Sequence, residues 1–88
     1  MDQQAFKAAR EAEGFTEFLI REWEPGKVVD THSHDFTAAV LVLEGEFTVD
    51  YDDGPTTYRP GDSCVVEAGT RHKETVGAEG VKFLVGRK

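Results

Sequence analysis

The sequence has little cysteine: Cys64 is the only one among 88 residues. A disulfide within the chain is therefore excluded, although domains this small often depend on disulfides, a bound metal or a second copy for stability. A metal ion or self-association remains as the expected reinforcement. The unpaired cysteine also fits a reducing compartment. A chain of this length provides one domain and no second one.

Basic residues are scarce as well. Lys and Arg total 10 against 17 Asp and Glu, which gives a formal net charge of −7. Such a surface repels phosphate backbones and anionic lipid headgroups, so we expect neither nucleic-acid nor membrane binding. No apolar run approaches the ~20 residues that span a bilayer. The N-terminus lacks the basic start and apolar stretch of a signal peptide, so the sequence predicts a cytoplasmic location.

Good helix formers are concentrated near the N-terminus and predict a short helix over residues 2–13. Asp2 is placed to cap its start and Gly14 to end it. The apolar stripe of this helix is thin, so the helix must pack on another element to persist. We therefore divide the chain into an N-terminal helix in residues 1–14 and a single β-domain in residues 15–88.

From residue 15 onward the pattern is typical of strands separated by turn signals. The predicted strands cover residues 15–23, 27–34, 36–43, 46–51, 56–59, 63–66, 70–76 and 81–85. Glu44-Gly45 and residues 77–80 are interpreted as turns that end strands. Seven or eight short strands of this kind predict an all-β sandwich or barrel. Its interior is expected to contain a row of apolar side chains: Phe36, Val40, Val42, Phe47, Val49 and Tyr51.

Histidine is rare, but two of the three histidines form the pair His32-Ser33-His34. Residues two apart on a strand project from the same face, so both rings could reach one ion at about 2.0–2.2 Å. Taken alone, such a pair is equally compatible with two solvated histidines near a strand end.

The spacing around the histidines resembles the two motifs of the cupin family. The first, G-x5-H-x-H-x3-4-E-x6-G, is matched at Gly26, His32, His34 and Gly45. The second, G-x5-P-x-G-x2-H-x3-N, is matched at Gly61, Gly69 and His72. The resemblance covers residues 26–76. It implies a cupin-type double-stranded β-helix, a jelly-roll barrel, with a divalent transition metal on His32, His34 and His72.

The sequence departs from these motifs at three positions. Ala38 replaces the glutamate ligand of the first motif, and it faces the same side as the histidines. Glu67 and Val76 replace the proline and asparagine of the second, outside the expected metal shell. Three neutral imidazoles would then hold the ion, which could be iron, zinc, nickel, copper or manganese. An ion with its full charge favours an anionic ligand or acidifies a bound water.

Other polar residues near the motifs have two interpretations each. Glu74 shares a strand face with His72, so it could approach the ion and act as a catalytic acid or base. A rim glutamate in solvent is the favoured alternative. Arg59 and Arg71 could meet an anionic ligand, although a surface cation is the default. Cys64 is interpreted as a packed cysteine.

The sequence is compatible with two alternative functions. The first is a metal-dependent enzyme acting on a small organic or anionic substrate. The second is a non-catalytic module that binds or senses a small molecule and resembles the sensor cupins of AraC-type regulators without their DNA-binding part. In either case we expect a small, partly apolar ligand and a homodimer, with residues 15–23 as the self-association segment.

Overall fold

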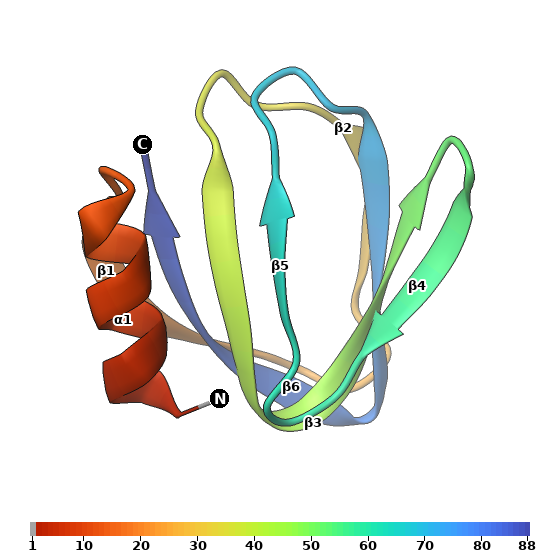
Figure 1. Cartoon of the computed structure of the whole chain (residues 1–88). Helices are drawn as coiled ribbons and strands as arrows, with labels where there is room; N and C mark the ends of the chain where they lie inside the picture. The colour runs from red at the N-terminus through yellow and green to blue at the C-terminus, as the bar shows by residue number, and fades with distance from the viewer. Residues whose placement is uncertain (1) are drawn as a thin grey trace.

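A computed structural model describes residues 2–88 as one helix followed by six strands (Figure 1). The elements are α1 (Gln3–Ala12), β1 (Thr16–Trp23), β2 (Val28–His32), β3 (Ala38–Tyr51), β4 (Gly54–Tyr58), β5 (Ser63–Val66) and β6 (His72–Arg87). The pairings are antiparallel, in the order β1-β6-β3-β4, with β2 also on β6 and β5 also on β3. The predicted all-β fold with a short N-terminal helix is confirmed.

Two predicted turns are wrong, because the chain continues through them as strand. The segments around residues 44–45 and 77–80 lie inside β3 and β6, so the structure has six strands where seven or eight were expected. Gly45 and Gly80 have φ angles of 73° and 80°, and a Cβ on Gly45 would collide with the carbonyl oxygen of Gly80. Glycines with positive φ bend a strand at a bulge without ending it.

These bends fold the sheet back on itself. Both long strands curve at the bottom of Figure 1, so that their two halves face one another. The enclosed core contains the predicted residues Val40, Val42, Phe47 and Val49, with Tyr51 packed against them. Five of the six residues predicted for the interior row are therefore confirmed in the core, and the sixth, Phe36, lines the pocket described below.

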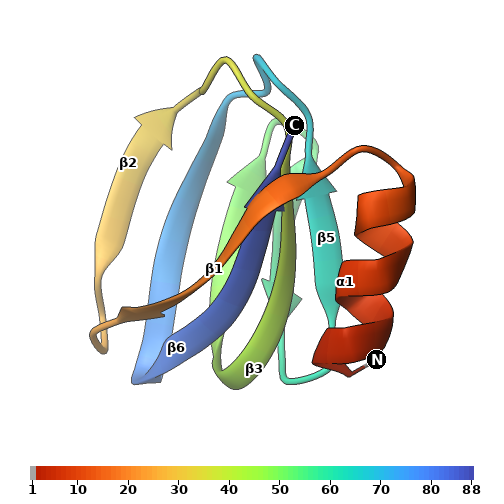
Figure 2. The same ribbon diagram turned by 90° about the vertical axis from the view of Figure 1, so that its left-hand side faces the viewer.

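Helix α1 follows the predicted caps. The Asp2 carboxylate accepts a hydrogen bond from the backbone N–H of Ala5 at 2.8 Å, and Gly14 has a φ of 98°. The helix lies against the outer face of the sheet (Figure 2), where Phe6 is fully buried in a second cluster with Leu41 and Leu84. Burial of one such ring stabilises the fold by about 2–3 kcal/mol. No helix within residues 2–88 is long and apolar enough to cross a membrane.

Candidate metal centre

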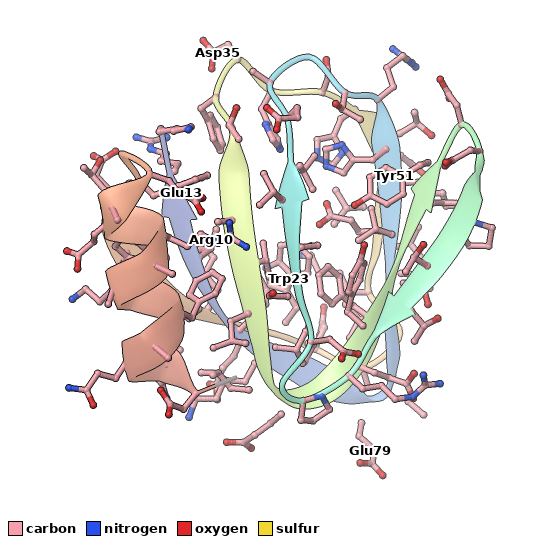
Figure 3. All side chains as sticks on the ribbon, in the orientation of Figure 1. Arg10, Glu13, Trp23, Asp35, Tyr51 and Glu79 are labelled. Atoms are coloured by element: carbon pink, nitrogen blue, oxygen red, sulfur yellow. The ribbon has the colours of Figure 1, made fainter. Side chains whose placement is uncertain are left out.

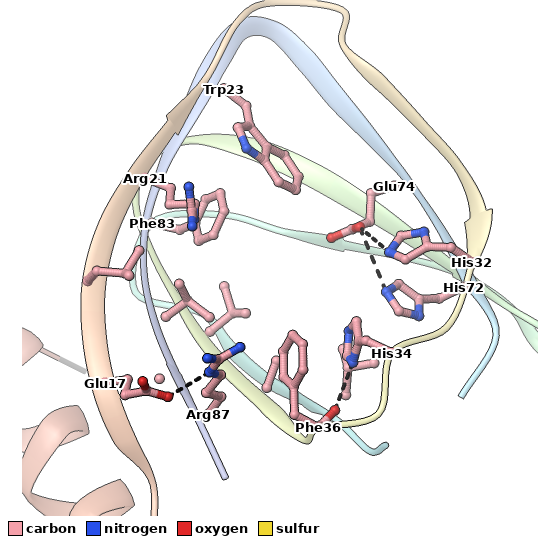
Figure 4. A pocket seen from close by; sticks show the side chains of 16 residues that line it. Glu17, Arg21, Trp23, His32, His34, Phe36, His72, Glu74, Phe83 and Arg87 are labelled. Atoms are coloured by element: carbon pink, nitrogen blue, oxygen red, sulfur yellow. Dashed lines mark hydrogen bonds and ion pairs between the residues drawn. The ribbon is translucent and has the colours of Figure 1, made fainter. Parts of the chain in front are cut away.

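Three imidazoles meet at one end of the sheet. His32 ends β2 and His72 begins β6, and the two are direct Cα partners across the antiparallel pair. His34 follows on the connection to β3. The ligand atoms of the three side chains all lie within 4.8 Å of one another (Figure 4). The strand pairing thus adds His72 to a pair that the sequence spacing had already placed on one face.

Each histidine ring is held by a hydrogen bond to the backbone. The Nδ1 atoms lie 2.7–2.9 Å from carbonyl oxygens two residues away, which belong to Asp30, Phe36 and Thr70 for His32, His34 and His72 respectively. A carbonyl only accepts, so each Nδ1 carries the proton and donates it. A neutral imidazole in this tautomer leaves the Nε2 lone pair free to bind a metal. Sequence spacing gave no signal for this arrangement.

Backbone contacts fix the loop that carries His34. The carbonyl of His34 accepts a hydrogen bond from the N–H of Gly69 at 2.8 Å. The Thr37 hydroxyl accepts from the N–H of Ala68 at 3.1 Å, and its backbone makes two bonds of 2.9 Å with Lys88. Gly69 has a φ of 82°, which explains why a glycine stands at this motif position. Hydrogen bonds from residues 68–69 and from Lys88 therefore hold the loop that carries His34.

A stack of side chains supports the His34 ring. The rings of His34 and Phe36 have centroids 4.3 Å apart and planes 10° apart. The guanidinium of Arg87 lies 5.0 Å from the centroid of Phe36, and its Nε donates to the Glu17 carboxylate at 2.7 Å. Glu17 and Arg87 come from opposite ends of the β-domain. Sequence reasoning missed both, because only the pairing of β1 with β6 brings them together.

Glu74 lies beside the histidines. Its Oε1 is 3.6 Å from Nε2 of His32 and 3.8 Å from Nε2 of His72, and its side chain is 14% exposed. The favoured expectation of a rim glutamate in solvent is therefore wrong. Burial raises the pKa of this carboxyl, and His72 and His32 would partly oppose the shift if they were protonated. Ala38 on β3 is buried in the pocket wall and has no carboxylate. The carboxylate beside the histidines comes instead from Glu74 on β6.

The donor set fits a divalent transition metal. Three free imidazole nitrogens and one adjacent carboxylate oxygen are ligands that first-row ions prefer. Nitrogens bound to one ion at about 2.1 Å in tetrahedral geometry lie about 3.4 Å apart. The three ligand atoms here lie within 4.8 Å of one another, so side-chain rotations that bring them about 1 Å closer would place them on an ion.

The histidines form one wall of a pocket of about 350 Å³. Apolar side chains line most of the remainder, among them Trp23, Val40, Phe83 and Val85. Arg21 and Arg87 face the same space from β1 and β6, across from the histidines (Figure 4). Alternation along β1 places residues 17, 19, 21 and 23 on one face, but Phe18 and Ile20 make the other face equally apolar, so the sequence did not show which face lines the pocket.

The arginines considered from the sequence lie elsewhere. Arg59 and Arg71 are exposed and do not line the pocket, and Arg59 pairs with Glu46 at 3.7 Å. Both are surface cations, as the default interpretation held. Cys64 packs against the core, as does Tyr51, whose ring is labelled in Figure 3. Burial raises the pKa of the Cys64 thiol to about 11, which agrees with a packed, unreactive cysteine.

Comparisons with known proteins agree with this architecture. A protein of unknown function from Rhizobium leguminosarum has a TM-score of 0.75 and 21% identity, over 80% of this chain and 66% of that chain. A cupin-2 domain containing protein from Shewanella frigidimarina has a TM-score of 0.67 and 19% identity, over 89% and 88%. A variant of oxalate decarboxylase from Bacillus subtilis has a TM-score of 0.70 and 20% identity, over 81% and 20%.

At these identities the structural likeness establishes the fold alone, and the chain spans 66% of the length of the Rhizobium protein. No curated protein matches the chain. The family model described as cupin domain matches residues 19–85, which include all three histidines. The chain, a small double-stranded β-helix with a short N-terminal helix, therefore belongs to the cupin domain family.

Proposed function

We propose that His32, His34 and His72 hold a divalent transition metal ion, which could be iron, zinc, nickel, copper or manganese. One observation carries the proposal: all three rings bind a backbone carbonyl through Nδ1, which leaves Nε2 free, and the ligand atoms of the three side chains lie within 4.8 Å of one another. Solvated histidines need no such common orientation. The hydrogen bonds also lower the entropic cost of assembling the site, because the rings are already oriented.

We propose further that the protein is a metal-dependent enzyme acting on a small organic, anionic substrate. A bound ion would polarise a carbonyl or activate water or dioxygen there. The pocket volume of about 350 Å³ lies at the small end of the range for ligand sites. Its apolar walls would exclude water from the bound substrate. Glu74 would act as the catalytic acid or base, since its Oε1 lies beside two of the three Nε2 atoms.

A second candidate function is supported by Ala38. The first motif of the family carries a glutamate ligand there, and an alanine cannot ligate an ion. Loss of that ligand is compatible with a pocket that binds or senses a small molecule without turning it over. The two candidates share the metal and the ligand, and they differ in the role of Glu74.

One variant tests the metal centre, and a second separates the two candidates. His72→Ala should reduce bound metal to background, because it removes a buried ligand, whereas Arg71→Ala changes an exposed neighbour and should retain metal. Glu74→Gln should keep the metal and the fold. If the protein is an enzyme, turnover of a substrate found by screening falls by about 10²- to 10⁴-fold in Glu74→Gln. Turnover unchanged in this variant would contradict the assigned role of Glu74. Metal retained in His72→Ala would contradict the ligand set.

We also propose that the protein acts as a cytoplasmic homodimer and that residues 15–23 form its contact. Strand β1 stands at the edge of the sheet and exposes Leu19 and Ile20, at 42% and 49%. An open edge with apolar side chains is a common site of pairing between copies. Gel filtration with light scattering should give the mass of two chains, and Ile20→Lys should give the mass of one. A wild-type monomer at micromolar concentration would contradict this proposal.

A further inference from the structure

We propose that Arg21 binds the far end of the ligand, so that the pocket selects small organic acids with two functional ends. One end carries oxygen atoms that chelate the metal, and the other carries a carboxylate. The inference deepens the proposed function and depends on it for the end that faces the metal. It begins from the position of Arg21 on β1, across the pocket from the histidines (Figure 4).

The strand geometry directs Arg21 into the pocket. Residues 17, 19, 21 and 23 all line it, as alternate positions on one strand face do. Arg21 is the direct Cα partner of Phe83, which is buried on β6 and lines the same pocket. Arg21 thus stands as a charged, exposed side chain at the rim of the pocket, between Leu19 and Trp23.

No protein group within residues 2–88 neutralises this charge. The Arg21 side chain forms no ion pair, hydrogen bond or ring contact there, whereas the Arg87 side chain is held by Glu17 and lies over Phe36. A guanidinium without a counter-charge presents a fork of N–H donors to the pocket. A carboxylate matches that fork with two parallel hydrogen bonds.

The distribution of charge favours an anion at this position. The whole chain carries a formal charge of −7, yet the two acidic side chains of the pocket already have partners. Glu17 pairs with Arg87, and Glu74 lies among the histidines. With a divalent ion bound, the charge of the ion and of Arg21 exceeds that of Glu74. The pocket is then positive inside an acidic protein.

The residues between the two charged ends define the middle of the ligand. Val40, Phe83 and Val85 line the space, and they offer no hydrogen-bonding side chains. A hydrocarbon segment suits this section, because a polar segment would lose its hydrogen bonds to water without replacement. The ligand class is therefore a short-chain dicarboxylic acid with a keto or hydroxy group beside one carboxylate.

Titration with a matched pair of probes tests this assignment. α-Ketoglutarate and α-ketovalerate have the same chain and the same chelating end, and only the former carries a distal carboxylate. Trp23 is the only tryptophan and lines the pocket, so its fluorescence reports occupancy. The wild type should bind α-ketoglutarate about 10- to 100-fold more tightly than α-ketovalerate, which corresponds to one charge-assisted hydrogen-bonded pair.

Arg21→Ala should remove this preference, with affinity for α-ketovalerate changed less than about twofold. Arg21→Lys keeps the charge without the fork and should restore part of the preference. Arg71→Ala removes the same charge outside the pocket and should keep the full preference for α-ketoglutarate. A wild-type preference below about twofold, or a preference retained in Arg21→Ala, overturns the assignment. Arg21 is exposed, so its substitution is not expected to unfold the protein.

The same titrations on metal-free protein separate this inference from the proposed metal centre. The preference for the distal carboxylate arises at Arg21, so it should persist without metal, although both probes bind more weakly. An Arg21-dependent preference in a protein that takes up no metal supports the anion site and contradicts only the metal centre. Absence of the preference both with and without metal overturns the anion site, whatever the metal content.

Discussion

Phe36→Ala should weaken metal binding by removing the face against which the His34 ring rests. The two rings are stacked, with centroids 4.3 Å apart and planes 10° apart. An aromatic pair of this kind contributes about 0.5–1.5 kcal/mol beyond its burial. The hydrogen bond from Nδ1 of His34 ends on the backbone carbonyl of Phe36, so it survives the substitution. Only the stacking is lost, which corresponds to an affinity about 2- to 10-fold weaker.

Competition between the protein and a chromophoric chelator for zinc measures this change. Phe36→Tyr keeps the ring and should bind zinc as the wild type does. Arg87→Ala removes the cation on the other face of Phe36, without touching His34, and should change the affinity less than about twofold. Urea unfolding of the metal-free variants shows whether the fold is intact. An affinity unchanged in folded Phe36→Ala would refute the supporting role of the stack.

Three further predictions concern the fold. Phe6→Ala removes a fully buried ring and should lower the free energy of unfolding by about 3–5 kcal/mol in urea, since the cavity cannot fill. Gly45→Ala places a Cβ against the Gly80 carbonyl at a φ of 73°, so we expect a loss of about 2 kcal/mol or more; unchanged stability would contradict the bulge. The pKa of Cys64 is raised from 9.0 to about 11, so its contribution to stability is complete below pH 9 and is lost as the pH rises toward 11. Unfolding measured across this window should show a steeper alkaline loss in the wild type than in Cys64→Val.

Local signals in the sequence predicted the helix and the interior row. Asp2 and Gly14 act within a few residues of the helix they delimit, and the alternation of Phe47, Val49 and Tyr51 is a property of one strand. The same local reasoning failed at Gly45 and residues 77–80. Glycine permits both a turn and a bulge, and the choice depends on the partner strand that lies across it.

In the candidate site, too, the sequence predicted some residues and missed others. Motif spacing brought out His32, His34 and His72 because their separations along the chain are characteristic of the family. The burial of Glu74 depends on how deeply β6 is covered by the other strands. The strand face shared with His72 was therefore compatible both with a glutamate beside the ion and with a rim glutamate in solvent. Arg21 and Arg87 were missed because the pairing of β1 with β6 joins residues more than half the chain apart. No local pattern in the sequence predicts the register between β1 and β6.

Nitrogen-15 NMR of the imidazole rings tests the central claim most directly. Long-range proton–nitrogen correlations of metal-free protein at neutral pH should place all three histidines in the tautomer protonated at Nδ1. Addition of one equivalent of zinc should then shift the three Nε2 resonances together and leave the Nδ1 protons in place. Rings protonated at Nε2, or Nε2 resonances that do not respond to zinc, would contradict the three-histidine centre.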